Sequence, residues 1–121
     1  KTVIEMCNKI TKNKYKNKFR PFDLIKDKME EKFDFIYSVA VLHMFITKEH
    51  RDKFLTFVKE HLNENGRCLL CVLNIAATSC RIVNWSELES EIINNNLIIE
   101  RRWISTEIPG FTTSMCVIVR K

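Results

Sequence analysis

Two short apolar runs on either side of an amphipathic helix constrain the fold of this chain more than any other feature of its sequence. The first run, Phe33–Leu42, is almost continuously apolar, and the second covers Arg67–Leu73. Runs of this length predict β-strands, and their lack of polar alternation is typical of strands buried on both faces of a parallel sheet. Between them, apolar residues recur with the period of an α-helix, at Phe54, Leu55, Phe57, Val58 and Leu62.

Residues that favour helix ends set the expected limits of two helices. Thr47 is a typical N-cap for the central helix, and Gly66 is the residue at which that helix is expected to stop. Ser86, followed three residues later by Glu89, has the spacing of a capping box. This box predicts a second helix that runs to about Asn94.

Further elements are predicted towards both ends of the chain. Thr2–Lys12 has the apolar spacing of a short helix, and Phe19–Ile25 predicts a brief strand. Leu97–Ile108 and Thr112–Val119 predict a β-hairpin around the turn at Pro109-Gly110. Strands that alternate with helices imply an α/β fold with a mainly parallel sheet, helices on both faces and a C-terminal antiparallel hairpin.

Size and composition limit the class of protein. With 121 residues, of which 45% are hydrophobic, the chain fits one globular domain over residues 1–121. No apolar run approaches the roughly 20 residues that a membrane span needs, and the count of two glycines argues against a Gly-rich phosphate loop within these residues. The first residues, Lys1 to Glu5, lack an initiator Met and a signal pattern. This beginning predicts the interior of a longer chain.

The net charge of +5 comes from one basic stretch. Six of the 20 Lys and Arg residues lie within Lys9–Arg20. One interpretation is a solvated helix end and loop. The other is a segment that binds phosphates of a nucleic acid, in which Tyr15 and Phe19 could stack on bases.

Five cysteines without a secretion signal predict reduced thiols and a cytoplasmic location. Cys68 and Cys71 have the CxxC spacing, but positions i and i+3 of a strand point to opposite faces of a sheet. The two sulfur atoms therefore cannot share a metal ion, and the sequence has no second ligand pair at a suitable spacing. We expect structural thiols and no metal site.

Two segments resemble a known enzyme family. Phe33–His43 and Phe54–Leu70 are similar to a region of class I S-adenosylmethionine-dependent methyltransferases, in which a strand beginning with FD is followed by an L-H turn, a helix, a glycine and a leucine-rich strand. Ile98–Ile104 with Met115–Val119 resembles the closing antiparallel pair of that family. The resemblance covers nearly the whole chain. It implies a Rossmann-like sheet, S-adenosyl-L-methionine as cofactor and methyl transfer to an unidentified small molecule.

The resemblance places cofactor-binding residues at the carboxyl ends of two strands, the edge at which open α/β sheets bind ligands. Asp23 would face the adenine amino group, with the backbone N–H of Leu24 beside it, because a carboxylate can accept a hydrogen bond from an exocyclic amine. Ser38 and Val39 would border the methionine end of the cofactor. The alternative for Asp23 is a turn residue that bonds its own backbone. The alternative for Ser38 and Val39 is simply the end of a core strand.

Two polar residues are candidates for the methyl-acceptor side of the site. His43 follows the first apolar run and is the candidate catalytic residue, able to orient a substrate or take its proton. Asn74 follows the second run and could hydrogen-bond the substrate. A packed structural histidine and a strand-terminating turn are the respective alternatives. His50 and His61 have no metal-ligand pattern around them and are expected at the surface.

The chain departs from the family in one respect. The family's first two strands, and the Gly-rich turn that holds part of the cofactor, have no counterpart in this sequence. We therefore interpret the chain as the C-terminal part of a methyltransferase, inactive alone and in need of an N-terminal segment or a protein partner. Two alternatives remain open: a non-catalytic methyltransferase-like module that acts through protein association, and a fragment of an RNA methyltransferase.

Overall fold

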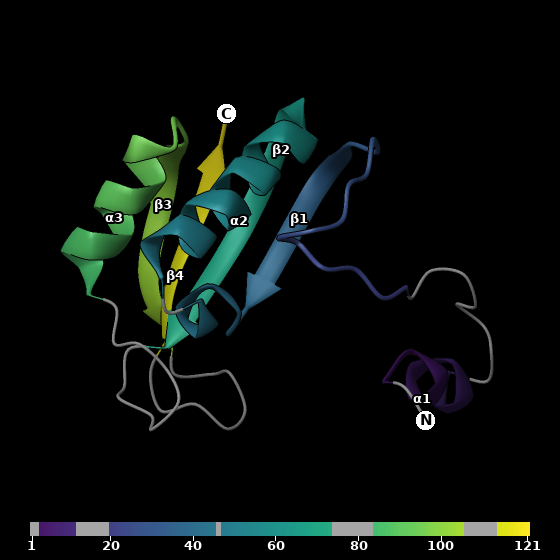
Figure 1. Cartoon of the computed structure of the whole chain (residues 1–121). Helices are drawn as coiled ribbons and strands as arrows, with labels where there is room; N and C mark the ends of the chain where they lie inside the picture. Colours follow the sequence, from purple (N-terminus) through teal and green to yellow (C-terminus); the bar gives the residue numbers. More distant parts are fainter. Residues whose placement is uncertain (1–2, 12–19, 46, 74–83, 106–113) are drawn as a thin grey trace.

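The computed structural model describes residues 3–11, 20–45, 47–73, 84–105 and 114–121. In chain order, and coloured from purple to yellow in Figure 1, the elements are α1 (Val3–Ile10), β1 (Phe33–Val39), the 3-10 helix η1 (Leu42–Met44), α2 (Lys48–His61), β2 (Leu62–Leu73), α3 (Trp85–Asn94), β3 (Ile98–Ser105) and β4 (Ser114–Arg120). None of the helices in these ranges has the length and apolar character that a membrane crossing requires.

The four strands form one mixed sheet in the order β1-β2-β4-β3. β1 pairs with β2 in parallel, whereas β4 is antiparallel to both β2 and β3. The predicted antiparallel pairing of the two C-terminal strands is therefore confirmed, whereas the predicted turn at Pro109-Gly110 lies outside the described residues. The last strand, β4, is inserted between β3 and the β1–β2 pair, so antiparallel pairings outnumber the parallel one. The mainly parallel sheet that we expected is not found among the described strands.

The segment before β1 forms a turn where the sequence predicted a strand. The described part of Phe19–Ile25 contains no strand, and residues 24–26 form a turn. The Asp23 side chain accepts the backbone N–H of Ile25 at 2.9 Å, and the Asp27 side chain accepts that of Asp23 at 2.7 Å. Aspartates that bond nearby backbone favour turns over extended chain. The hydrogen bonds of these two carboxylates therefore favour a turn in this segment, although its apolar residues favour a strand.

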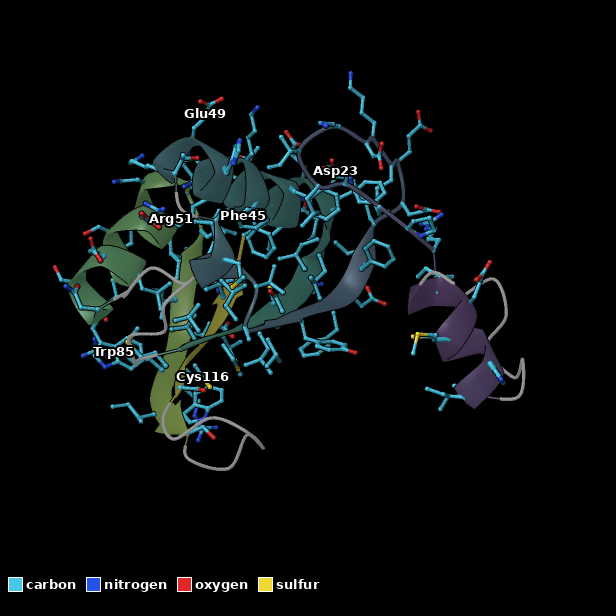
Figure 2. The ribbon with its side chains drawn as sticks, turned by 60° about the horizontal axis from the view of Figure 1, so that its bottom comes forward. Asp23, Phe45, Glu49, Arg51, Trp85 and Cys116 are labelled. Atoms are coloured by element: carbon cyan, nitrogen blue, oxygen red, sulfur yellow. The ribbon has the colours of Figure 1, made fainter. Side chains whose placement is uncertain are left out.

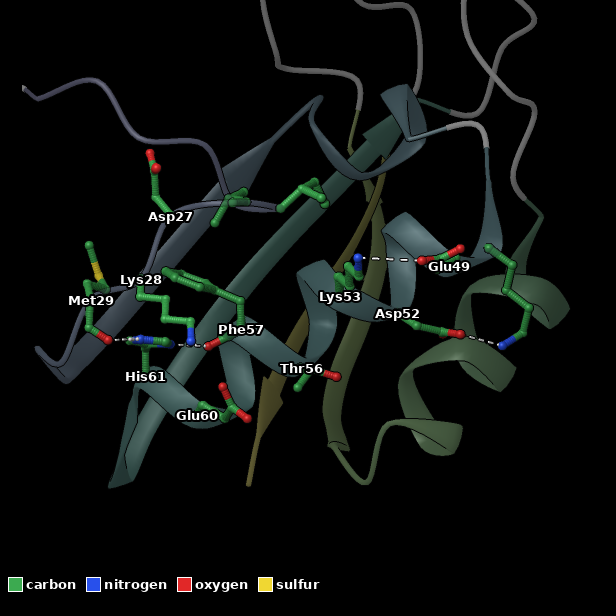
Figure 3. A pocket seen from close by; sticks show the side chains of 13 residues that line it. Asp27, Lys28, Met29, Glu49, Asp52, Lys53, Thr56, Phe57, Glu60 and His61 are labelled. Atoms are coloured by element: carbon green, nitrogen blue, oxygen red, sulfur yellow. Dashed lines mark hydrogen bonds and ion pairs between the residues drawn. The ribbon is translucent and has the colours of Figure 1, made fainter.

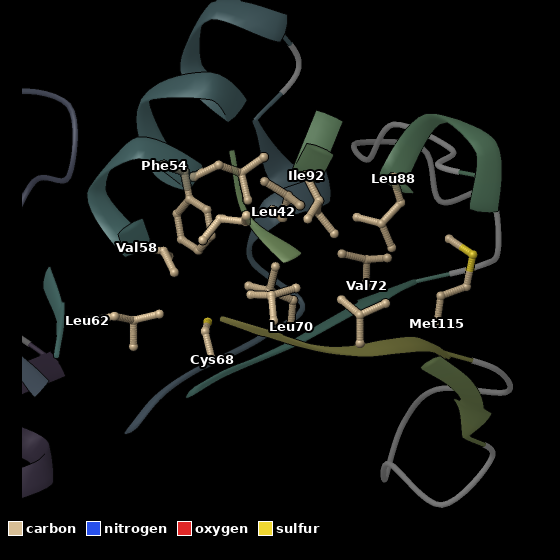
Figure 4. Close-up of a cluster of buried hydrophobic side chains, with 14 residues drawn as sticks. Leu42, Phe54, Val58, Leu62, Cys68, Leu70, Val72, Leu88, Ile92 and Met115 are labelled. Atoms are coloured by element: carbon tan, nitrogen blue, oxygen red, sulfur yellow. The ribbon is translucent and has the colours of Figure 1, made fainter. Parts of the chain in front are cut away.

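Helices α2 and α3 pack on the same face of the sheet (Figure 4). Strand alternation turns every second residue of β2 and β4 towards these helices. The buried cluster between the two layers consists of Leu42, Phe54, Leu55, Val58, Leu62, Cys68, Leu70, Val72, Leu88, Ile92, Leu97, Met115, Val117 and Val119.

The opposite face of the sheet is open at β1. Phe35 is 55% exposed and Tyr37 is 71% exposed. The prediction that this strand is buried on both faces is therefore wrong. Helices on both faces are likewise not found in the described part of the chain, because α1 lies apart from the sheet in Figure 1. β1 is also an edge strand, with β2 as its only partner among the described strands.

Two of the predicted helix limits are confirmed, and two are wrong. The second helix, α3, ends at Asn94 as predicted. Thr47 caps α2, because its hydroxyl accepts a backbone N–H of the first turn at 3.3 Å. Gly66 does not stop this helix: α2 ends at His61, and the chain enters β2 at the next residue. The second helix is capped by Asn84, whose side chain accepts a first-turn N–H at 2.9 Å, so Ser86 lies inside α3.

Gly66 instead allows β1 and β2 to approach closely. A Cβ atom at this position would lie 3.0 Å from the carbonyl oxygens of both Asn63 and Phe33. Because both oxygens belong to the backbone, neither can move away cheaply. We expect Gly66→Ala to lower the free energy of unfolding by about 1–3 kcal/mol, as measured by urea denaturation. Asn65→Ala, at an exposed neighbouring position, is the control, and equal losses in both variants would contradict this account.

Candidate functional site

The backbone of Ala40, which lies in the left-handed region, turns the chain at the carboxyl end of β1. Ala40 has a φ of +60°, a conformation that costs a residue with a side chain roughly 1–2 kcal/mol. Its N–H donates to the Cys71 carbonyl of β2 at 2.8 Å, so pairing with β2 continues to the residue at which the chain turns. Stored backbone strain of this kind clusters at ligand-binding sites. The strained residue therefore marks the carboxyl end of β1 as a candidate ligand-binding site.

A cavity of about 400 Å³ lies at this turn, where β1, α2 and the segment before β1 meet. Its walls are mostly apolar and consist of Leu24, Ile36, Tyr37, Ser38, Val39, Val41, Phe54, Phe57 and Val58. Three of the four residues predicted to bind the cofactor, Leu24, Ser38 and Val39, therefore line one cavity. Leu24 reaches this cavity from the turn at residues 24–26, since the described part of Phe19–Ile25 forms no strand.

Ser38 lines this cavity, and its hydroxyl is buried in the cavity wall. Only 8% of the residue is exposed, and its Oγ has no hydrogen-bond partner within the described residues. A buried hydroxyl left without a partner costs about 1–3 kcal/mol. A ligand atom that donates to this oxygen or accepts from it would remove that cost. The cavity therefore suits a largely apolar group that carries a polar edge.

Asp23 does not line the cavity, although its chain neighbour Leu24 does. Asp23 is exposed, and its Oδ1 accepts the backbone N–H of Ile25. This is the turn role that the sequence offered as an alternative. A role of Asp23 in binding adenine stays a prediction.

The two candidates for the acceptor side are not placed by the structure. The backbone of His43 lies in η1, directly after the cavity residue Val41 and the core residue Leu42. The side chain of His43 lies outside the described part of the chain, and so does the whole of Asn74. Both roles therefore stay predictions.

A second, more open groove of about 770 Å³ runs between α2 and residues 24–29 (Figure 3). His61 lies in its wall, with Nδ1 2.7 Å from the carbonyl oxygen of Phe57 and Nε2 2.9 Å from that of Met29. The ring also stacks on Phe57, with centroids 4.0 Å apart. The expectation that His61 lies at the surface is wrong, because these contacts bury it and fasten the segment before β1 to α2. His50 is half-buried, beside the Phe45 ring.

Sequence reasoning missed a charged pair that is buried close to the turn after β1. The Arg51 Nε lies 2.9 and 3.0 Å from the two carboxylate oxygens of Glu91, and the side chains are 3% and 9% exposed. The Arg51 Nη1 also donates to the carbonyl oxygen of Phe45 at 2.9 Å (Figure 2). Forty positions separate the two charged residues in the chain, and no local pattern signals that they meet.

Three of the cysteines are buried in the sheet. Cys68 belongs to the helix-side core, whereas Cys71 is paired in register with Cys116 of β4. The prediction that Cys68 and Cys71 face opposite ways is thus confirmed. Burial raises the pKa of the Cys68 thiol to about 12, and burial together with the neighbouring Cys116 raises that of Cys71 to about 12. Both thiols are therefore protonated at neutral pH. No cluster of three metal-ligating side chains occurs among the residues that the structure describes.

Comparison with known proteins gives matches in structure and none in sequence. No family model and no curated protein matches the sequence. An S-adenosylmethionine-dependent methyltransferase from Clostridium acetobutylicum superposes with a TM-score of 0.72 at 13% identity, over 96% of this chain and 71% of that chain. An O-methyltransferase family 2 protein from Planctomyces limnophilus, in complex with apigenin, gives 0.74 at 15% identity, over 98% of this chain and 40% of that one.

A third similar structure includes bound ligands. It is the 1,6-didemethyltoxoflavin-N1-methyltransferase from Burkholderia thailandensis, with 1,6-didemethyltoxoflavin and S-adenosylhomocysteine bound. Its TM-score is 0.68 at 14% identity, over 83% of this chain and 48% of that chain. At these identities the likeness establishes the fold. The chain has the Rossmann-like α/β fold found in these methyltransferases, and it spans less than half of the length of two of the three.

Proposed function

We propose that this chain is the C-terminal part of an S-adenosylmethionine-dependent methyltransferase that acts on a small molecule. The observation that carries the proposal is the cavity at the carboxyl end of β1, where Leu24, Ser38 and Val39 meet. The similar structures support the cofactor, since all three are methyltransferases by name and the Burkholderia enzyme binds S-adenosylhomocysteine. Two of them bind a small organic molecule as well, which supports the acceptor class.

The residues at the cavity fit such a cofactor. When bound, S-adenosylmethionine supplies an electrophilic methyl group on a sulfonium. Leu24 and Val39 offer apolar contact, and the buried Ser38 hydroxyl would gain the hydrogen-bond partner that it lacks among the described residues. Asp23 precedes the cavity residue Leu24 in the chain. Its carboxylate would accept a hydrogen bond from the adenine amino group.

The acceptor side of the proposed site begins after β1. We assign His43 to orienting the acceptor or holding its proton on a ring nitrogen, and Asn74 to hydrogen-bonding the acceptor. Methyl transfer depends mainly on aligning the nucleophile with the methyl group, and a base is needed only when the acceptor is protonated.

The proposed site is incomplete in this chain. The chain spans 71%, 40% and 48% of the three similar structures. We propose that the remaining wall of the cofactor site comes from a preceding segment or from a partner protein, and that these 121 residues do not transfer methyl groups alone. Cofactor binding without turnover is the activity expected of them.

A second candidate function is association with another protein, as a non-catalytic module. It is favoured by the edge of β1 that has no partner among the described strands and by two exposed aromatic rings of β1, Phe35 and Tyr37, whose centroids lie 6.4 Å apart. Unpaired edge strands readily add a strand from another chain. This candidate predicts association without any affinity for S-adenosylhomocysteine, which separates it from the first.

The proposal is tested by calorimetric titration of S-adenosylhomocysteine into the purified chain and into Ser38→Ala. We expect saturable binding to the original chain and about 3- to 10-fold weaker binding to the variant, the worth of one hydrogen bond. Without ligand, Ser38→Ala should be at least as stable as the original chain, because the variant removes a buried hydroxyl that has no partner among the described residues.

The matched control is Ser90→Ala on an exposed position of α3, which should change neither affinity nor stability. Asp23→Ala should also weaken binding. The absence of saturable binding to the original chain would reject the proposal that these residues form part of a cofactor site.

A further inference from the structure

The turn that follows the cavity is held from the side by Arg51. Its guanidinium bonds the Glu91 carboxylate of α3 through Nε and Nη2, and its Nη1 donates to the Phe45 carbonyl at 2.9 Å. Phe45 is the residue directly after η1. One buried side chain thus connects the beginning of α2, the body of α3 and the exit of the turn after β1.

The same turn lines the cavity at its start and packs on a cavity-lining residue at its end. At its start, Val41 lines the cavity and accepts the N–H of Met44 at 2.9 Å. At its end, the Phe45 ring packs against Phe54, a second cavity residue, with centroids 5.7 Å apart. A shift of Phe45 would therefore move the turn and a cavity wall together.

We propose that Arg51 is a positioning residue that fixes the turn 41–45 against the cavity, and that ligand affinity at the cavity depends on this bond to Phe45. The inference rests on the proposed function for its ligand, S-adenosylhomocysteine, but its structural part does not. Glu91 orients the guanidinium, and Arg51 transmits that orientation to the backbone of the turn. The backbone of the candidate catalytic residue His43 lies inside the same turn.

The planar, forked guanidinium explains why arginine is needed in this position. It can bond a carboxylate with one edge while a third nitrogen reaches a carbonyl oxygen in another direction. A lysine ammonium is a compact charge on a flexible stem. Arg51→Lys therefore keeps a cation for Glu91 while weakening the hold on Phe45.

A second polar connection between α2 and α3 offers a matched control. Asn95 Nδ2 donates to Asp52 Oδ1 at 3.0 Å and to the Glu91 carbonyl at 2.8 Å. Asp52 adjoins Arg51 in the chain but lines neither the cavity nor the turn. Asp52→Ala therefore loosens the contact between the helices without removing the bond to Phe45.

The experiment measures hydrogen exchange of the Met44 and Phe45 amides, which are hydrogen-bonded within the turn, in the original chain, Arg51→Lys and Asp52→Ala. Calorimetric titration of S-adenosylhomocysteine follows on the same three proteins. We expect about tenfold faster exchange and about tenfold weaker binding in Arg51→Lys, and no change of either in Asp52→Ala.

Amide exchange at the original rate in Arg51→Lys would overturn the inference. Equally accelerated amide exchange in Asp52→Ala would also overturn it, because the turn would then respond to any loosening of the contact between α2 and α3. Faster exchange with unchanged affinity would also overturn it. If the original chain binds no S-adenosylhomocysteine, the proposed function fails, and the exchange measurement still decides whether Arg51 holds the turn. If Arg51→Lys does not fold, Glu91→Asp replaces it, because this variant withdraws the carboxylate by one methylene. The inference then requires faster amide exchange and weaker binding in Glu91→Asp.

Discussion

Arg51→Met is expected to lower the free energy of unfolding by about 3–5 kcal/mol, the loss typical of breaking a buried ion pair. The Glu91 side chain is only 9% exposed, so its carboxylate would stay buried after losing the guanidinium. The Phe45 carbonyl would lose a donor as well. Urea denaturation followed by circular dichroism measures the effect, provided that the slope of the transition is unchanged.

The double variant Arg51→Met with Glu91→Leu separates the cost of an orphaned charge from the worth of the pair. Replacing both partners of a buried ion pair by apolar residues is often nearly neutral. We therefore expect the double variant to recover most of the stability that Arg51→Met loses. A double variant as unstable as the single one would mean that the pair itself, and not the orphaned carboxylate, accounts for the loss.

Leu70→Ala is expected to cost about 2–5 kcal/mol, because it empties a fully buried position between the sheet and the two helices. Leu69 is the next residue on β2 and points to the other face of the sheet, where it is half-buried. Leu69→Ala removes the same atoms from a less covered position and should cost less than half as much. The same denaturation measurement applies to both variants.

The comparison of these two leucines also tests how the sheet is covered. Similar losses at Leu69 and Leu70 would mean that both faces are packed equally. This result would contradict the arrangement in which the described helices cover one face of the sheet. Figure 4 shows that arrangement for the cluster around Leu70.

The sequence predicted those parts of the fold that depend on local pattern. The helical period before Leu62 and the apolar runs around Phe35 and Leu70 correspond to α2, β1 and β2. Pairing partners are not local, so the sequence could not reveal that β4 is inserted next to β2. The sequence also could not reveal the exposure of Phe35, because an apolar run is equally compatible with a strand covered on one face of the sheet or on both.

The position of the candidate cavity was predictable to the extent that strand ends mark ligand-binding edges. That rule and the family resemblance together led to Ser38 and Val39, and both line the cavity. Leu24 came from the family resemblance, and it reaches the cavity through a turn that the sequence did not predict. The contacts of Arg51 and His61 could not be predicted, because each joins residues more than 30 positions apart and neither lies in a recognisable motif.

The position of β4 inside the sheet affects the order in which this fold can assemble during translation. β3 is made before β4, yet its only partner among the described strands is β4. As the polypeptide leaves the ribosome, β1, α2 and β2 can associate early through nearby contacts. β3 must wait for the seven residues of β4. A message truncated before Ser114 would therefore yield a nascent chain in which β3 lacks its partner and β2 is paired only with β1, so that cellular quality control would encounter an incomplete sheet.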